Sequence, residues 1–328
     1  MIKTVGILTS GGDAPGMNAA IRAITKASMH YGLTPIGIRD GFEGMIRGSF
    51  LEMKYADVDN IIQRGGTILG SARCDEFRQK EGRQIAIKNI QDKGIDSLIV
   101  IGGDGSFRGA FALSTEAKIP IIGLPATIDN DLYGTDESIG FDTALNTIIS
   151  SIDNIRNTAY SHKRIFFVEV MGRDSGFLAL NSAIASGAES VLIPESISDL
   201  PKLAEQIKTQ NKGRRGSIII VAEGEEEGGA MDIKRKIQPL LPGFELRTTI
   251  LGHVQRGGTP TYFDRSLATR SGVKAVELLM AGKSELMVGL CDGEVKDIPL
   301  KDAIQKKAIL DLSKEVILEK LLTKKRDS

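Results

Sequence analysis

The sequence predicts an α/β protein of two doubly wound, Rossmann-like lobes with mostly parallel sheets. Short apolar segments rich in β-branched residues recur along the chain, and helix-like stretches separate them. The length of 328 residues exceeds what one ordinary hydrophobic core holds, which favours two domains. Alternating strands and helices predict right-handed βαβ crossovers and a parallel sheet in each lobe.

The expected strands are nearly continuous in apolar residues, as in parallel strands buried on both faces. In chain order they are TVGILT (4–9), SLIVIGG (97–103), IPIIGLP (119–125), RIFFVEVMG (164–172), SVLIPE (190–195) and SIIIVAEG (217–224). The expected helices are 17–31, 85–94, 143–156 and 264–282. In the first helix Ala20, Ile21, Ile24 and Ala27 share one face. Ligands of such folds bind at the carboxyl ends of the strands, so the loops there carry the functional signal.

The composition narrows the class of partners. Lys+Arg 42 balances Asp+Glu 42, which argues against nucleic-acid or membrane-surface binding along the whole chain. The two cysteines, Cys74 and Cys291, give neither a disulfide framework nor metal-ligand spacing, as expected in a reducing cytoplasm. The apolar stretch at the N-terminus is too short for a signal peptide or a membrane span. No repeat or Pro-rich linker marks a boundary, and the clearest composition shift lies near residue 138.

The loop TSGGDAPGMN (9–18) follows the first strand. Gly11 and Gly12 permit a close backbone approach, and Pro15 suits the first turn of a helix. Free N–H groups at such a helix start favour a phosphate. A tight βα turn without a ligand is the alternative reading. The loop matches neither the dinucleotide fingerprint nor the Walker pattern, and GGTILGS (65–71) has Walker spacing without the lysine.

The loop GGDGS (102–106) follows the strand SLIVI. Asp104 is the candidate Mg²⁺ carboxylate, since Mg²⁺ is usually bound by one or two carboxylates plus phosphate oxygens. Ser106 and the N–H groups of the next helix would meet phosphate oxygens. A glycine turn is again the alternative.

The loop LPATIDNDLYGT (124–135) follows the next strand, so parallel pairing should bring its start near GGDGS. Asp, Asn and Gly also dominate ordinary turns. Two carboxylate loops beside a glycine loop favour a phosphoryl-transfer site, with Asp129 as the candidate base.

A fourth group is cationic and lies at strand ends or just beyond them, where guanidinium groups can bind phosphate oxygens in pairs. It comprises Arg164, Met171-Gly172-Arg173, Arg247 and His253-Val254-Gln255-Arg256. Solvated arginines and a structural histidine are the alternative readings. His30 and His162 are read as structural.

Over nearly its whole length the sequence resembles the bacterial ATP-dependent 6-phosphofructokinase family. The matching motifs are GILTSGGDAPGMNA, GGTILGSAR, VIGGDGS, GLPATIDND, SHKRI, VEVMGR and LGHVQRGG with the DR after it. GGDG alone is weak, because lipid and NAD kinases share it, but the ordered set is specific. The resemblance implies a cytoplasmic glycolytic kinase, usually a homotetramer, that transfers the γ-phosphoryl group of ATP to the 1-hydroxyl of fructose 6-phosphate.

The resemblance also implies roles for matched residues. The residues implied in catalysis are Asp129, Thr127 and Arg173, and Asp104 is implied as the ligand of Mg²⁺. The ATP site is lined by Gly12, Arg73, Cys74, Gly103, Asp104, Gly105 and Ser106. Fructose 6-phosphate is bound by Thr127, Asp129, Asp131, Arg164, Met171, Gly172, Arg173, Glu223, Arg247, His253 and Arg256. In the family the counterparts of Arg164 and Arg247 reach into a neighbouring subunit's site.

An allosteric pocket, activated by ADP and inhibited by phosphoenolpyruvate, is implied at Arg22, Lys26, Arg156, Glu189, Lys212, Arg214 and Arg215. Lys26 stands where the family often has arginine, and KYAD (54–57) lacks an arginine common there. The resemblance implies interleaved lobes: residues 1–138 plus about 251–305 for ATP and Mg²⁺, and 139–250 plus about 306–328 for fructose 6-phosphate.

Two residues bear on the phosphoryl donor. Pyrophosphate-dependent relatives generally carry aspartate at the position of Gly105 and lysine at that of Ala126. Gly105 leaves room for the α-phosphate and favours ATP, and Ala126 replaces the glycine usual in the ATP group. The alternatives are a pyrophosphate-dependent enzyme, a sugar kinase with another acceptor, and a non-catalytic regulatory nucleotide-binding subunit.

Overall fold

The computed structural model describes residues 2–210 and 216–322 and divides the chain into two compact units. The first contains the chain up to Thr143 and Arg256–Ala308, and the second contains Ala144–Gln255 and the chain from Ile309 onward. The boundaries expected from the sequence lie at about 138, 250 and 305. Both units are built around a largely or wholly parallel sheet, so the expected fold class is confirmed.

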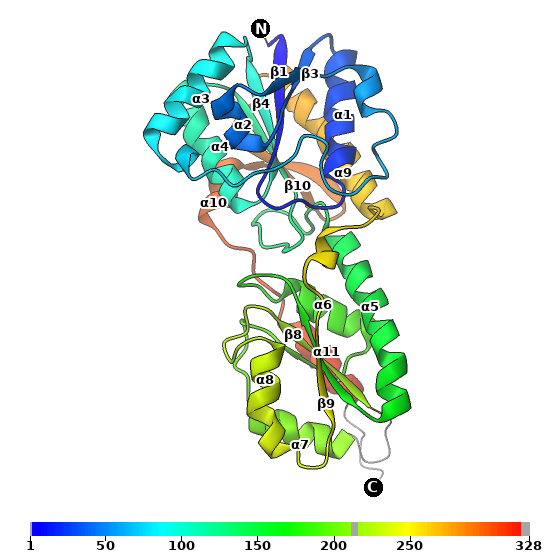
Figure 1. The fold of residues 1–328 in the computed structure, drawn as a ribbon. Helices are drawn as coiled ribbons and strands as arrows, with labels where there is room; N and C mark the ends of the chain where they lie inside the picture. The colour runs from blue at the N-terminus through cyan, green and yellow to red at the C-terminus, as the bar shows by residue number, and fades with distance from the viewer. Residues whose placement is uncertain (1, 211–215, 323–328) are drawn as a thin grey trace. The chain divides into compact units, whose positions relative to one another are not determined.

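The first unit contains a seven-stranded sheet of order β11-β10-β5-β4-β1-β2-β3 (Figure 1). The strands are β1 (Thr4–Ser10), β2 (Thr34–Ile38), β3 (Phe50–Glu52), β4 (Ser97–Gly102), β5 (Ile121–Pro125), β10 (Leu286–Cys291) and β11 (Glu294–Pro299). The helices are α1 (Met17–His30), α2 (Gly41–Arg47), α3 (Lys80–Asp92), α4 (Asp104–Ala117), α9 (Tyr262–Met280) and α10 (Leu300–Gln305). The five central strands are parallel, and the edge strands β3 and β11 pair antiparallel.

Helices cover both faces of this sheet. The helices α1 and α9 pack against each other on one face, whereas α2, α3 and α4 lie on the other (Figure 1). All six residues of β4 are buried, in agreement with its continuous apolar sequence. Phe42 of α2 stacks on Phe77 in the cluster beneath α2, α3 and α4.

The second unit contains a four-stranded parallel sheet of order β7-β8-β6-β9. The strands are β6 (Ile165–Val170), β7 (Ser190–Leu192), β8 (Ser217–Ala222) and β9 (Leu246–Ile250). The helices are α5 (Phe141–His162), α6 (Phe177–Ser186), α7 (Leu200–Gln210), α8 (Ala230–Ile237) and α11 (Ser313–Leu322). The division between the units falls within the first turn of α5.

Some local expectations were wrong. The helix after the first glycine loop begins at Met17 with Gly16 as its N-cap, so Pro15 precedes the helix instead of lying in its first turn. Gly16 has a φ of +110°, a conformation that glycine adopts readily and that other residues rarely do. The second expected helix is longer than predicted, at Lys80–Asp92. No helix of the described residues is long and apolar enough to cross a membrane.

Candidate active site

Three candidate loops meet at one edge of the first sheet, because β1, β4 and β5 are neighbours and parallel. Gly102 at the end of β4 pairs with Pro125 at the end of β5, and the Ala126 N–H donates to the Gly102 carbonyl over 3.0 Å. A side chain at Gly11 would lie 3.3 Å from Oγ of Ser106. The expectation that the Asp129 loop starts beside GGDGS is therefore confirmed.

The glycine loop after β1 is fixed from two sides. Ser71 Oγ donates to the Gly11 carbonyl over 2.5 Å, and Gly11 has a φ of +88°. Arg256 Nη1 donates to the Asp13 carbonyl over 3.3 Å, and any Cβ at Gly12 would overlap this guanidinium. Glycine at position 12 thus lets Arg256 lie directly against the loop.

The loop after β4 leads into α4, whose first residue is Asp104. Ser106 is buried, whereas a Cβ at Gly105 would meet nothing within 4 Å. Arg108, one turn along the helix, places its Nε 3.0 Å from Oδ1 and 2.9 Å from Oδ2 of Asp104. Sequence reasoning missed this arginine, although its spacing of four residues from Asp104 is the signal that finds it.

The residues at this loop fit a magnesium ion bound together with phosphates. Among the described residues no group of three or more His, Cys, Asp or Glu could hold a metal ion, and the carboxylate at the start of α4 is that of Asp104. Its side chain is 43% exposed, and Gly105 leaves open space beside it. One carboxylate completed by phosphate oxygens and water is the usual environment of Mg²⁺ at nucleotides.

The loop after β5 holds the candidate base in a rigid turn. Asp129 is only 2% exposed, and its N–H donates to Thr127 Oγ1 over 3.2 Å. Asn130 has a φ of +53°, and its Oδ1 accepts from the Ser138 N–H over 2.7 Å. Ser138 Oγ donates to the Thr127 carbonyl over 2.5 Å. These bonds join the two ends of the loop, so the Asp129 backbone is fixed in position.

A buried carboxylate that sequence reasoning left without a role lies between the glycine loop and the start of α5. Asp264 of α9 has no exposed surface and accepts hydrogen bonds from Gly140 N–H (2.7 Å), Thr143 N–H (2.8 Å) and Thr143 Oγ1 (2.5 Å). Gly140 in turn contacts the glycine loop, since a Cβ there would lie 2.7 Å from Cβ of Ala14. Burial raises the pKa of Asp264 to about 6, although the hydrogen bonds from Thr143 and Gly140 oppose the rise.

In the second unit the MGR turn follows β6. Glu223, just beyond β8, accepts with one oxygen from the Gly172 N–H (3.3 Å) and the Arg173 N–H (2.7 Å). The buried Gln255 accepts from the Met171 N–H over 3.1 Å, and Gly172 has a φ of +144°. The structure therefore brings Met171, Gly172, Arg173 and Glu223 together.

Arg164 and Arg247 lie at the amino ends of their strands, opposite the MGR turn, as expected for Arg164, which opens the predicted strand RIFFVEVMG. Arg164 immediately precedes β6, and Arg247 is the second residue of β9. Both pair with Glu245, through Arg164 Nε at 2.9 Å and through Arg247 Nη2, and Arg164 above all holds the pKa of that carboxyl below its ordinary value. At ~3.3 Å per residue, the length of β6 separates them from the MGR turn by roughly 20 Å. Only the place of Arg247 was not predicted, because the apolar pattern of the sequence does not reveal the partly exposed strand β9.

The remaining candidates are more scattered. His253 is exposed in a short 3₁₀-helix, Gly252–Arg256. Arg73 is exposed between β3 and α3, while Cys74 packs partly against the cluster beneath α2 and α3. Asp131 follows Asn130 and is half-buried.

The candidate allosteric residues form two groups, one in each unit. In the first unit Arg22 and Lys26 lie on α1, and Lys26 Nζ is 2.9 Å from Oδ1 of Asp59 and 3.7 Å from the ring centre of Tyr55. In the second unit Arg156 Nη1 is 3.6 Å from Oε1 of Glu189. Lys212, Arg214 and Arg215 lie outside the described residues.

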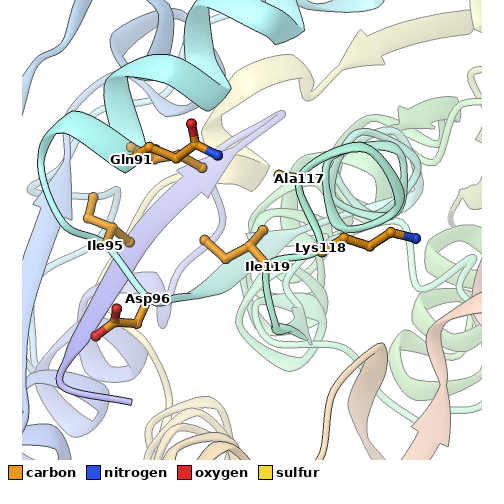
Figure 2. Close-up of a pocket in the computed structure, with 7 residues that line it drawn as sticks. Gln91, Ile95, Asp96, Ala117, Lys118 and Ile119 are labelled. Carbon is orange, nitrogen blue, oxygen red and sulfur yellow. The ribbon is translucent and has the colours of Figure 1, made fainter. Parts of the chain in front are cut away.

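A cavity of about 170 Å³ lies at the opposite, amino ends of β4 and β5. It is lined by the ends of α3 and α4 and by the segments that enter the two strands, and Figure 2 shows Lys118 directed away from Ile95 and Ile119. Because parallel α/β sheets bind ligands at the carboxyl ends of their strands, this cavity is not part of the candidate site.

The chain is thus a two-unit α/β protein whose candidate phosphate-binding loops lie at the carboxyl ends of β1, β4 and β5. A sequence model described as phosphofructokinase matches residues 4–279. The chain belongs to the phosphofructokinase family.

Curated relatives match nearly the whole chain. It is 53% identical over 305 residues to ATP-dependent 6-phosphofructokinase 2 of Bacteroides thetaiotaomicron, which covers 93% of this chain and 94% of the relative. It is 51% identical to ATP-dependent 6-phosphofructokinase 1 of Thermus thermophilus, with 97% of this chain and 100% of the relative covered.

Solved structures share the fold. The crystal structure of Pichia pastoris phosphofructokinase in the T-state matches with a TM-score of 0.87 and 39% identity, over 93% of this chain and 35% of that one. This chain thus spans about a third of the yeast chain. A pyrophosphate-dependent phosphofructokinase of Marinobacter aquaeolei matches with a TM-score of 0.84 at 21% identity, over 95% and 86% of the two chains, which is a likeness of fold alone.

Proposed function

We propose that the chain is an ATP-dependent 6-phosphofructokinase. It transfers the γ-phosphoryl group of ATP to the 1-hydroxyl of fructose 6-phosphate and yields fructose 1,6-bisphosphate and ADP. The observation that carries this proposal is the junction of the GGDGS loop with the Asp129 loop, at Gly102–Ala126, beside a glycine loop. The curated relatives of Bacteroides and Thermus carry the same activity in their names.

Asp129 accepts the proton of the attacking 1-hydroxyl. A positioned carboxylate suits this role, and Asp129 is buried in a turn that Asn130 and Ser138 tie together. Thr127 lies on the same turn, where its Oγ1 accepts from the Asp129 N–H and holds the backbone that carries the carboxylate. Arg173 supplies positive charge to the developing transition state, since electrostatic stabilisation and positioning perform most of phosphoryl transfer.

The donor binds to the first unit. The glycine loop offers backbone N–H groups at the start of α1, and Ser106 offers its own N–H at the start of α4. The ATP site consists of Gly12, Arg73, Cys74 and Gly103 to Ser106. Asp104 would hold Mg²⁺, which neutralises phosphate charge when bound. Gly105 gives room for the α-phosphate, because nothing lies within 4 Å of its Cβ position.

In the first unit the residues assigned to the acceptor sugar are Thr127, Asp129 and Asp131. In the second unit they are the MGR turn and Glu223. His253 and Arg256 bind its phosphate side. Arg164 and Arg247 serve the site of a neighbouring subunit in a homotetramer. The support for this assignment is their place at the amino ends of β6 and β9, about 20 Å along the sheet from the MGR turn of their own chain.

Regulation follows the family pattern, with ADP as activator and phosphoenolpyruvate as inhibitor. These effectors bind to Arg22 and Lys26 on α1 and to Arg156, Glu189, Lys212, Arg214 and Arg215. Lys26 is held by Asp59 and Tyr55, so an anionic effector has to share this ammonium group with a carboxylate. The enzyme acts in the cytoplasm, where its glycolytic substrates are found.

The test is a coupled assay with fructose 6-phosphate as acceptor and either ATP or pyrophosphate as donor, with Mg²⁺. Activity with ATP at least a hundredfold above that with pyrophosphate is the expected result. Preference for pyrophosphate would contradict the donor assignment, and absence of turnover with both donors would favour a regulatory subunit. ATP turnover that requires another sugar phosphate would favour a different kinase.

A further inference from the structure

The candidate magnesium carboxylate is paired with an arginine of its own helix. Both oxygens of Asp104 lie within 3.0 Å of Nε of Arg108. The two side chains are 43% and 60% exposed, and they are four residues apart on α4. No role has been assigned to Arg108 so far.

This pair has to change when a magnesium–nucleotide complex binds. The divalent cation and the guanidinium would both be attached to one carboxylate, and like charges at such a distance repel each other. Exposed ion pairs of this spacing are weak, so Arg108 can leave Asp104 at little cost. A freed guanidinium has five N–H donors in a fork that fits phosphate oxygens.

The surroundings of Arg108 give a freed side chain room on the donor side of α4. Gly105 lies between Asp104 and Arg108 on the exposed side of the helix, and a Cβ there would meet no atom within 4 Å. The neighbouring Phe107 and Ala110 are fully buried and face the core. Arg108 is therefore on the face of α4 that begins with Asp104 and the open space at Gly105.

We propose that Arg108 is a further donor-binding residue, which Asp104 holds in the free enzyme and which binds the polyphosphate when the cation occupies Asp104. The exchange keeps the carboxylate and the guanidinium partnered both before and after binding. It also couples the arginine to the metal: without Mg²⁺, Asp104 competes with the nucleotide for Arg108. This inference rests on the proposed ATP-dependent function.

The experiment is calorimetric binding of ATP, ADP and AMP to the full chain, with Mg²⁺ and with EDTA, without any sugar phosphate. Arg108→Gln should weaken Mg–ATP binding about tenfold, as expected for the loss of one charge-assisted contact worth roughly 1.4 kcal/mol. The loss should be smaller for AMP than for ATP. It should shrink in EDTA, because the wild-type arginine then remains on Asp104. Arg108→Lys should recover part of the affinity.

The matched control is Arg47→Gln on α2. Arg47 also pairs with a carboxylate four residues back along its own helix, Glu43, and it belongs to none of the candidate loops. This variant should bind Mg–ATP like the wild type. An Arg108→Gln variant whose ATP affinity stays within twofold of wild type would overturn the proposal, and so would an equal loss with Mg²⁺ and with EDTA.

Failure of the proposed function gives a different pattern. A wild-type chain that binds Mg–ATP but does not phosphorylate fructose 6-phosphate would refute the kinase assignment, while the Arg108 comparison would still decide the role of this arginine. A wild-type chain that binds no ATP would overturn both.

Discussion

The substitution Asp264→Asn measures how much folding stability is lost when the buried carboxylate at the start of α5 ionises. The carboxylate has no exposed surface, and its partners Gly140 and Thr143 stand at the start of α5. Burial raises its pKa from 3.8 to about 6. Because the native state holds the proton more tightly than the unfolded chain, this group makes the protein less stable as pH rises from about 4 to above 6. The linked loss between pH 5 and 7.5 is about 1–2 kcal/mol.

Asparagine cannot ionise, so the variant lacks this pH-dependent loss. Its unfolding free energy relative to wild type should rise by about 1–2 kcal/mol between pH 5 and pH 7.5, whatever the fixed cost of the changed hydrogen bonds. Urea denaturation followed by far-UV circular dichroism measures it, since the chain has no tryptophan for fluorescence. Asp153→Asn on the exposed side of α5 is the control. A difference between wild type and Asp264→Asn that is equal at both pH values would refute the reasoning.

Three further predictions concern catalysis. Asp129→Ser should lower kcat by at least the ~10²–10⁴-fold typical of a lost general base, with little change in KM. A variant that keeps more than half of the wild-type kcat in steady-state assays would exclude this role. Gly105→Asp should lower kcat/KM for ATP by repelling the α-phosphate without disturbing the fold, since its Cβ meets open space; an unchanged kcat/KM would show that the donor is not selected there. Inactive Arg164→Ser and Asp129→Ser chains, dissociated and reassembled together, should form hybrids more active than either parent; hybrids seen by native mass spectrometry without that gain would place Arg164 in its own chain's site.

The loops of the first unit were predictable because each motif follows a strand that is apolar throughout. A continuous run such as SLIVIG identifies β4, and parallel pairing then determines that its end lies beside the end of β5. The turns beside the candidate side chains also fit the local sequence. Asn130 and Gly172 have positive φ there, and Asn and Gly are the residue types that adopt this conformation most readily.

Other features depend on tertiary contacts that no local pattern encodes. Asp264 follows the HVQRGG motif, but its partners Gly140 and Thr143 lie more than a hundred residues earlier in the chain. The strand β2 (TPIGI) contains Pro35 and Gly37, which are poor strand formers, yet it is held between β1 and β3. The position of Arg247 could not be inferred because β9 is short and partly exposed, unlike the buried strands that the apolar pattern reveals.

Transfer of the ATP γ-phosphoryl group to the 1-hydroxyl of fructose 6-phosphate can be followed directly at both atoms. The measurement is ³¹P and ¹³C NMR of the purified chain with Mg–ATP and fructose 6-phosphate labelled with ¹³C at C1. We expect loss of the γ-phosphate signal, growth of the ADP signals, and phosphorus coupling at the labelled C1, all abolished in Asp129→Ser. A phosphate on any other carbon, or ATP that stays intact while the sugar is bound, would contradict it.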